Sequence, residues 1–136
     1  MASLSDIREE YEFLDSKDDR QRLIIELGRE LEPMPAALKV DKTLVKGCNA
    51  SVWTYPTRNA DGSLHFLADS TSAITKGIIA LVVTIVQDRA PADILSLDIN
   101  EQLEPFDVKN HLSSSRTSGI PNMIKLIRET AERYAG

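Results

Sequence analysis

The stretch that organises this chain runs from Ser51 to Ala68 and reads SVWTYPTRNADGSLHFLA. Its first part, Ser51 to Thr57, is rich in valine, tryptophan, threonine and tyrosine, which favour β-strands. The turn at Arg58 to Gly62 carries an Asp-Gly pair, and Leu64 to Ala68 returns as a second strand. We therefore expect an antiparallel hairpin, with Pro56 at a sheet edge or a bulge.

The segment after the hairpin, Ala73 to Arg89, is the most apolar part of the chain. Its β-branched residues would also suit a buried strand. Its length favours a helix, as do the capping residues from Asp69 to Ser72 and the Ala90-Pro91 pair that follows. Because the segment is apolar nearly all round, we expect the central buried helix here.

Apolar residues at helical spacing predict further helices on both sides of this centre. The expected helices are Ser3–Phe13, Asp18–Leu31, Pro91–Leu97, Ile99–Phe106 and Ile120–Ala135. Glu32 to Thr43 reads as a linker, a short strand near Thr43 to Val45 is expected to join the hairpin, and His111 to Gly119 is polar. The predicted class is α+β: a single domain over residues 1–136, with a small antiparallel sheet of about three strands and helices packed on one face.

The composition excludes several classes of protein. The net charge is −5, with 16 basic and 21 acidic residues, and no basic stripe of the kind that binds nucleic acid is present. The longest apolar run, Ile78 to Val86, has nine residues, too few to span a membrane. From the acidic N-terminal region we expect neither a secretory signal nor a transit peptide. We expect a cytoplasmic protein, or a mature organellar one, that binds neither nucleic acid nor membrane.

Cys48 is the only cysteine in the 136 residues. One cysteine forms no internal disulfide and no cysteine-rich metal site, and neither histidine has ligand spacing, so no metal and no cofactor are expected. A lone cysteine is often simply buried. Here Gly47 permits an exposed turn and Lys46 favours the thiolate, so a reactive thiol is the competing interpretation. Arg116 in the polar segment suits an anion or a carboxylate of a partner.

Three stretches together resemble the SufE family. Val45–Trp53 is similar to its reactive-cysteine segment, Ala68–Ile78 to the start of its central helix, and Leu112–Ile120 to its Ser-Arg-x-x-Gly segment before the last helix. The order, the spacing and the chain length also match. The chain has Lys46 where the family often has proline and Asn49 where it often has glutamine.

The resemblance implies a fold shared with IscU-type scaffolds and a function in sulfur transfer. Family members accept sulfur from the persulfide of a PLP-dependent cysteine desulfurase (SufS-like or CsdA-like), stimulate that enzyme and pass the sulfur to an iron–sulfur scaffold complex (SufBCD-like). The resemblance assigns the persulfide-accepting nucleophile to Cys48, and the PLP would belong to the desulfurase. The loop and partner-contact candidates are Lys46, Gly47, Asn49 and Arg116.

Two alternatives come from other classes of function. A non-covalent activator would stimulate the desulfurase without using Cys48. A thiol-dependent hydrolase or peroxidase would need a base, for which His65 and His111 are the only histidines. The absence of a second cysteine to resolve a sulfenic acid counts against the peroxidase.

Overall fold

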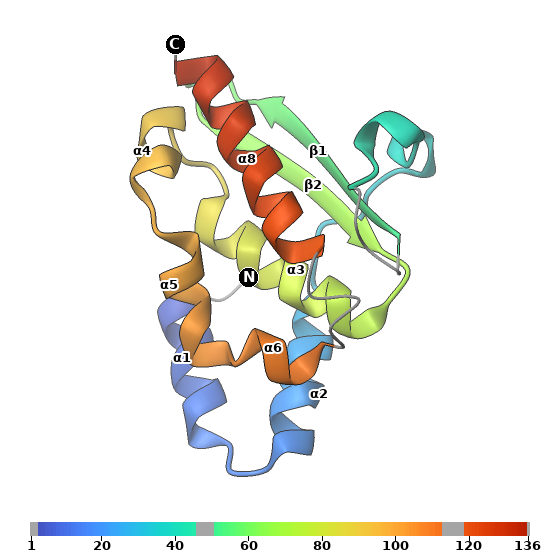
Figure 1. Cartoon of the computed structure of the whole chain (residues 1–136), viewed down its shortest axis with the longest axis vertical. Helices are drawn as coiled ribbons and strands as arrows, with labels where there is room; N and C mark the ends of the chain where they lie inside the picture. The colour runs from blue at the N-terminus through green and yellow to red at the C-terminus, as the bar shows by residue number, and fades with distance from the viewer. Residues whose placement is uncertain (1–2, 46–50, 113–118, 136) are drawn as a thin grey trace.

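The computed structural model describes residues 3–45, 51–112 and 119–135 (Figure 1). Within these ranges the chain combines one antiparallel strand pair with α-helices and short 3-10 helices, labelled η, so the predicted α+β class is confirmed. The helices are α1 (Leu4–Phe13), α2 (Lys17–Arg29), η1 (Ala36–Leu38), η2 (Asp41–Thr43), α3 (Ala73–Val86), α4 (Pro91–Ser96), α5 (Ile99–Leu103), η3 (Glu104–Phe106), α6 (Val108–His111) and α8 (Gly119–Ala135).

The predicted hairpin consists of β1 (Val52–Arg58) and β2 (Leu64–Ser70). One face of β2 is buried, since Leu64, Phe66 and Ala68 are each at most 2% exposed. Side chains alternate between the two faces of a strand, so the intervening residues of β2 form the other, half-buried face. Helix α3 packs against β2 and α8 against β1.

The expected third strand near Thr43 to Val45 is reduced to a single bridge between Leu44 and Trp53, so the expectation of about three strands is wrong by one within the described ranges. Thr43 instead closes η2, because its hydroxyl donates to Leu38 O at 2.6 Å and accepts from Val40 N at 3.2 Å. A threonine hydroxyl that bonds to nearby backbone groups competes with the ladder of a sheet.

Helix α3 is the central buried helix, as predicted, but it ends at Val86 rather than Arg89. The next residue, Gln87, leaves the helix and turns its side chain to the free edge of β2. There Gln87 Oε1 accepts from Phe66 N at 2.7 Å and Gln87 Nε2 donates to Phe66 O at 2.9 Å. Arg89 continues this pairing, because its carbonyl oxygen accepts from Leu64 N at 3.0 Å.

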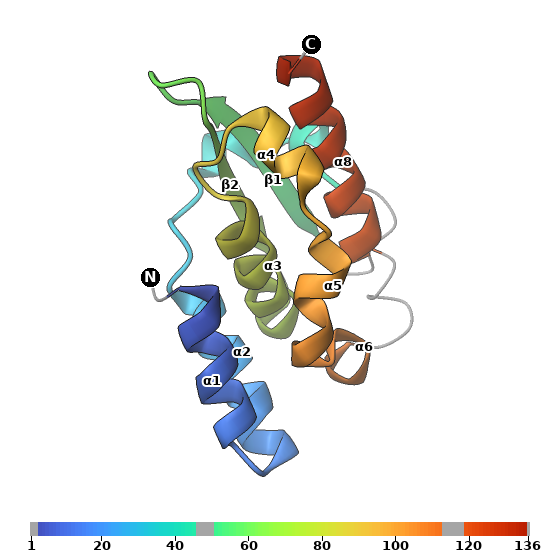
Figure 2. The same cartoon turned by 90° about the vertical axis from the view of Figure 1, so that its left-hand side faces the viewer.

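Helices α2 and α3 approach each other closely at Gly28 and Gly77. A Cβ atom at Gly77 would overlap the Ile24 carbonyl group, and one at Gly28 would lie 2.8 Å from Gly77 N. Helix α2 therefore rests directly on the backbone of α3. Helix α1 lies beside α2, in front of it in the side view (Figure 2).

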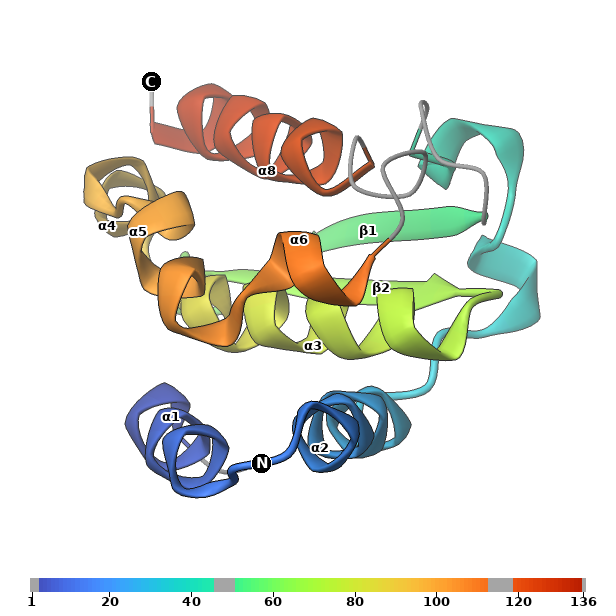
Figure 3. The ribbon, with the colours of Figure 1, turned by 60° about the horizontal axis from the view of Figure 1, so that its bottom comes forward.

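The α1–α2 pair lies on one side of α3 and the sheet, and α8 lies on the other (Figure 3). Helix α8 also packs against α4. The short helix α6 was not predicted, because its four residues contain little periodicity and end at the start of the polar segment. The predicted short helix Ile99–Phe106 is present as α5 followed by η3.

Candidate functional site

The site residues predicted from the sequence lie outside the described residues. Lys46, Gly47, Cys48 and Asn49 fall within residues 46–50, and Arg116 falls within residues 113–118. Their assignment therefore stays a prediction. The structure shows instead how the residues that flank residues 46–50 are held.

Both ends of residues 46–50 are tied to the sheet. Before the segment, Val45 N donates to Val52 O at 2.7 Å, and Val45 is 3% exposed. After the segment, Ser51 N donates to Thr71 Oγ1 and Thr71 N donates to Ser51 O, both at 3.1 Å. Cys48 is thus three residues from either anchored end. Functional groups on rigid supports are positioned more accurately than groups on unsupported loops.

A half-buried ion cluster lies beside these anchors; we call Asp69, Lys39 and Lys76 the Asp69 cluster. Asp69 lies directly across the hairpin from Trp53. Its carboxylate oxygens are 2.5 Å from Lys39 Nζ and 3.2 Å from Lys76 Nζ, and Asp69 Oδ1 also accepts from Ser70 N at 2.8 Å. The Asp69 side chain is only 13% exposed.

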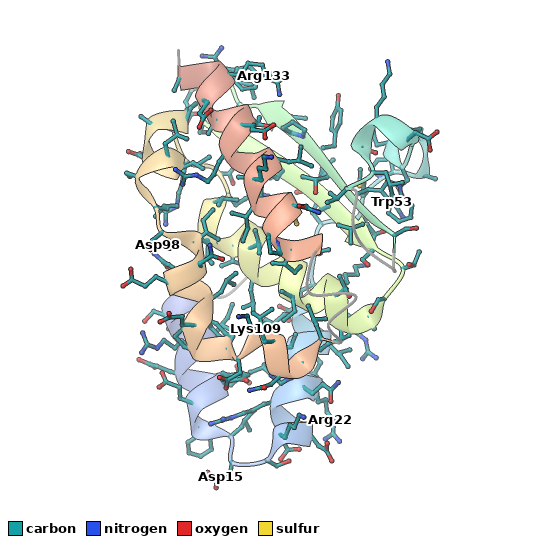
Figure 4. All side chains as sticks on the ribbon, in the orientation of Figure 1. Asp15, Arg22, Trp53, Asp98, Lys109 and Arg133 are labelled. Carbon is teal, nitrogen blue, oxygen red and sulfur yellow. The ribbon has the colours of Figure 1, made fainter. Side chains whose placement is uncertain are left out.

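The electrostatics of Asp69 favour its charged form. Burial by itself would raise the pKa of this carboxyl group, but hydrogen bonds from Lys39, from Ser70 N and from Lys76 outweigh burial and hold the pKa below its ordinary value. Lys39 Nζ also lies 5.7 Å from the centre of the Trp53 ring, within reach of a cation–π contact. Trp53 accordingly lies where β1 faces the two 3-10 helices η1 and η2 (Figure 4).

One groove of about 540 Å³ is lined by residues near both predicted segments, residues 46–50 and residues 113–118. Leu44, which precedes residues 46–50, and Asn122, which follows residues 113–118, both line it. Phe66 of the buried sheet face also contributes to its lining. The chain that leads to Cys48 and the chain that follows Arg116 therefore border the same groove.

His65 has both of its ring nitrogens engaged by carboxylates. His65 Nε2 is 2.8 Å from Glu32 Oε1, and His65 Nδ1 is 2.8 Å from Asp88 Oδ1. His65 is also five residues along β2 from Ser70, roughly 17 Å at the usual rise of a strand. A role as general base would require His65 to give up one of these carboxylates.

His111 is 8% exposed and lies 2.7 Å from the Tyr11 hydroxyl through Nε2. Its Nδ1 is buried and has no hydrogen-bond partner among the described residues. Burial lowers its pKa, Lys17 and Arg20 lower it further, and the charge of Asp107 opposes this effect. These contacts join α6 to α1, so His111 has a structural role in the described part of the chain.

Neither a metal site nor a membrane-spanning helix is found in the described ranges. There, no group of three or more His, Cys, Asp or Glu side chains is arranged to hold a metal ion. None of the helices in the same ranges is long and apolar enough to cross a bilayer.

Sequence reasoning missed the Asp69 cluster, although Asp69 belongs to one of the stretches that carried the family resemblance. Lys39 and Lys76 are 30 and 7 residues away from Asp69 in the sequence, so no local pattern joins the three side chains. The only available signal was the strand pairing, which places residue 69 near the start of the hairpin.

The fold and the anchored segment define a class: a small α+β protein that carries one cysteine between two supported ends of chain. The chain belongs to the SufE family, since residues 5–131 match the family described as "Fe-S metabolism associated domain". This confirms the predicted resemblance and assigns the protein to iron–sulfur metabolism.

Two relatives are similar in sequence to this chain over nearly its whole length. A SufE-like protein of Rhizobium meliloti (strain 1021) is 35% identical over 97% of this chain and 96% of its own, and one of Rhizobium etli is 33% identical over 97% and 91%. The solution structure of a hypothetical protein from Thermus thermophilus has the same fold, with a TM-score of 0.75 and 13% identity over 97% of this chain and 95% of that chain.

Proposed function

We propose that this chain is a cytoplasmic sulfur acceptor that takes persulfide sulfur from a cysteine desulfurase onto Cys48. It stimulates the desulfurase and relays the sulfur to iron–sulfur cluster assembly. The observation that carries the proposal is the match to the SufE family, which spans the only cysteine of the chain. The desulfurase is PLP-dependent and SufS-like or CsdA-like, and the receiver is a SufBCD-like scaffold complex.

The transfer is a thiol–persulfide exchange. The Cys48 thiolate attacks the terminal sulfur of the donor persulfide, and a new sulfur–sulfur bond forms on Cys48. The old sulfur–sulfur bond breaks, and the donor cysteine leaves as a thiolate. No net oxidation or reduction takes place, and the PLP chemistry that makes the persulfide stays in the desulfurase.

The described residues support this chemistry by anchoring both ends of the Cys48 segment. The ties at Val45 and Ser51 keep its support fixed while the partner approaches. In the proposal, Lys46, Gly47, Asn49 and Arg116 contact the partner or shape the segment. A supported nucleophile needs less ordering in the transition state, which raises the rate of exchange.

The test is a sulfur-transfer assay with a purified desulfurase and cysteine. We expect the intact mass of the wild-type chain to rise by one sulfur atom, and peptide mapping after alkylation to locate the sulfur at Cys48. Cys48→Ser should take up no sulfur and relay none. Ser113→Ala, a small hydroxyl change in the other predicted segment, is the matched control and should accept sulfur as the wild type does.

Two outcomes would overturn this proposal. Sulfur uptake by Cys48→Ser would place the acceptor elsewhere. Full stimulation of the desulfurase by Cys48→Ser, with no sulfur on the wild-type chain, would identify a non-covalent activator instead.

A further inference from the structure

The Asp69 cluster joins three separate parts of the chain at one carboxylate. Lys39 belongs to the linker, Asp69 to β2 and Lys76 to the first turn of α3. The lysine side chains are 30% and 33% exposed, so all three groups are largely withdrawn from water. Removing one member of such a group leaves the others poorly compensated, which makes the cluster a strong structural tie.

The position of the cluster matters more than its strength. Asp69 faces Trp53 across the hairpin, and Trp53 forms the bridge to Leu44. The neighbouring residue, Val52, accepts the hydrogen bond from Val45. The cluster therefore lies at the position in the hairpin where the chain that follows the linker is bound.

Lys39 is the charged link between the linker and the sheet. It lies six residues before Val45, and η2 with its Thr43 hydrogen bonds fills the interval. When Lys39 binds the sheet, the linker places Val45 so that it pairs with Val52 and with no other residue of the strand. On the far side, Lys76 connects the same carboxylate to α3, which begins two residues after the Thr71 that bonds to Ser51.

We propose that Asp69 is a positioning residue for sulfur acceptance by Cys48, because it holds Lys39 and Lys76 and so keeps both ends of residues 46–50 in place. This inference rests on the proposed function. In this role Asp69 acts through the two lysines and the anchored ends.

The test compares Asp69→Asn with the wild type in the desulfurase assay. We expect the saturating rate of sulfur transfer to fall about tenfold, since small displacements of a reacting group lower rates steeply. The acceptor concentration at half-saturation should change little. Alkylation of Cys48 by iodoacetamide, which needs no partner geometry, should go to completion at a rate close to that of the wild type.

Asp88→Asn is the matched control. Asp88 also pairs with a side chain at the edge of the same sheet, but its partner is the His65 ring, at the other end of β2. We expect this variant to transfer sulfur at the wild-type rate. Melting temperatures of both variants separate a loss of folded protein from a loss of transfer by folded protein.

A second variant keeps the test decisive if Asp69→Asn folds poorly. Lys39→Gln leaves Asp69 bonded to Lys76 and Ser70 N, so it should fold and lose a smaller part of the transfer rate. Because Asp69 and Lys39 act together, the loss in the double variant should be less than the product of the single losses.

The outcomes separate this inference from the proposed function. A wild-type chain that takes up no sulfur contradicts the proposed function and the inference with it. A wild-type chain that accepts sulfur, with Asp69→Asn as fast as Asp88→Asn, contradicts the inference alone. A raised half-saturation concentration at an unchanged saturating rate also overturns it, because Asp69 would then affect docking rather than positioning.

Discussion

Gln87 extends the sheet beyond β2 by bonding to both backbone polar groups of Phe66. The two hydrogen bonds, 2.7 and 2.9 Å long, imitate the pairing of a neighbouring strand. A buried backbone group needs such partners, so this side chain completes the edge of the hairpin.

Replacing Gln87 with leucine should lower the free energy of unfolding by about 2–3 kcal/mol, because Phe66 N–H and C=O lose their partners at a partly buried edge. Urea unfolding followed by circular dichroism measures this. Gln102→Leu, on helix α5, is the control and should have a much smaller effect. Equal effects of the two substitutions would show that the Phe66 pairing contributes nothing.

Gly77→Ala should destabilise the protein by about 2 kcal/mol, even though alanine favours helices. The added Cβ would overlap the Ile24 carbonyl group and push α2 away from α3. Gly28→Ala meets its nearest atom, Gly77 N, at 2.8 Å and should cost less. Thermal unfolding ranks the two variants. A melting temperature for Gly77→Ala at or above that of the wild type would contradict the observed close approach.

His65 should stabilise the fold most in mildly acidic solution. Burial works against its protonation, but hydrogen bonds and charge from Asp88 and Glu32 raise its pKa above the ordinary 6.5. Its contribution is therefore complete below pH 6.5 and is lost as the pH rises through the raised value. The hydrogen bond with His65 lowers the pKa of Asp88 below 3.8, so the contribution of Asp88 is complete above that pH and lost as the pH falls through the lowered value.

His65→Gln tests this pH dependence. The difference in unfolding free energy between wild type and variant should be largest between pH 3.8 and 6.5 and should shrink at higher pH. Denaturant unfolding across the pH range measures it, and an NMR titration of the ring locates the pKa. A difference that stays constant from mildly acidic to alkaline pH would show that protonation of His65 is not coupled to folding.

His111 should have the opposite pH dependence. Tyr11 has one hydroxyl proton, and both Phe106 O and His111 Nε2 lie within 3.0 Å of its oxygen. If Tyr11 donates to Phe106, then Nε2 of a neutral His111 carries the proton, and Nδ1 is a buried acceptor with no partner in the described part of the chain. Burial is the main cause that lowers the pKa of His111. Unfolded chains take up the proton first as the pH falls below 6.5, so stability is lost towards acid.

His111→Phe should remove part of this acid sensitivity. The unfolding free energy is measured at two pH values, about one unit above and about one unit below the ordinary histidine pKa. The ratio of the two free energies should be closer to one in the variant than in the wild type. His65→Gln provides the comparison, because its loss has the opposite sign. An unchanged acid sensitivity in His111→Phe would show that His111 is not the group that titrates.

Local patterns account for most of the elements and for the family. Helical spacing predicted α1 and α2, and length and capping residues predicted the central helix. The capping residues expected before the central helix include Ser72, which does accept from its first turn, and Ser3 and Ser16 cap α1 and α2 in the same way. The Asp-Gly turn is present, with Gly62 at a φ of 89° that side-chain-bearing residues rarely adopt. These features depend on neighbours in the sequence, so they can be read from it.

Long-range contacts decided the rest. The sequence by itself determined a hairpin, a buried helix after it and a lone cysteine before it, because strand propensity, capping and composition are local properties. Only the tertiary structure could show that Gln87 leaves the helix to pair with Phe66 and that Thr43 closes a turn instead of a strand. Only the tertiary structure could show that Lys39, Asp69 and Lys76 lie together at one position of the hairpin. No sequence pattern indicates which charges, separated along the chain, are shielded from water at the same place.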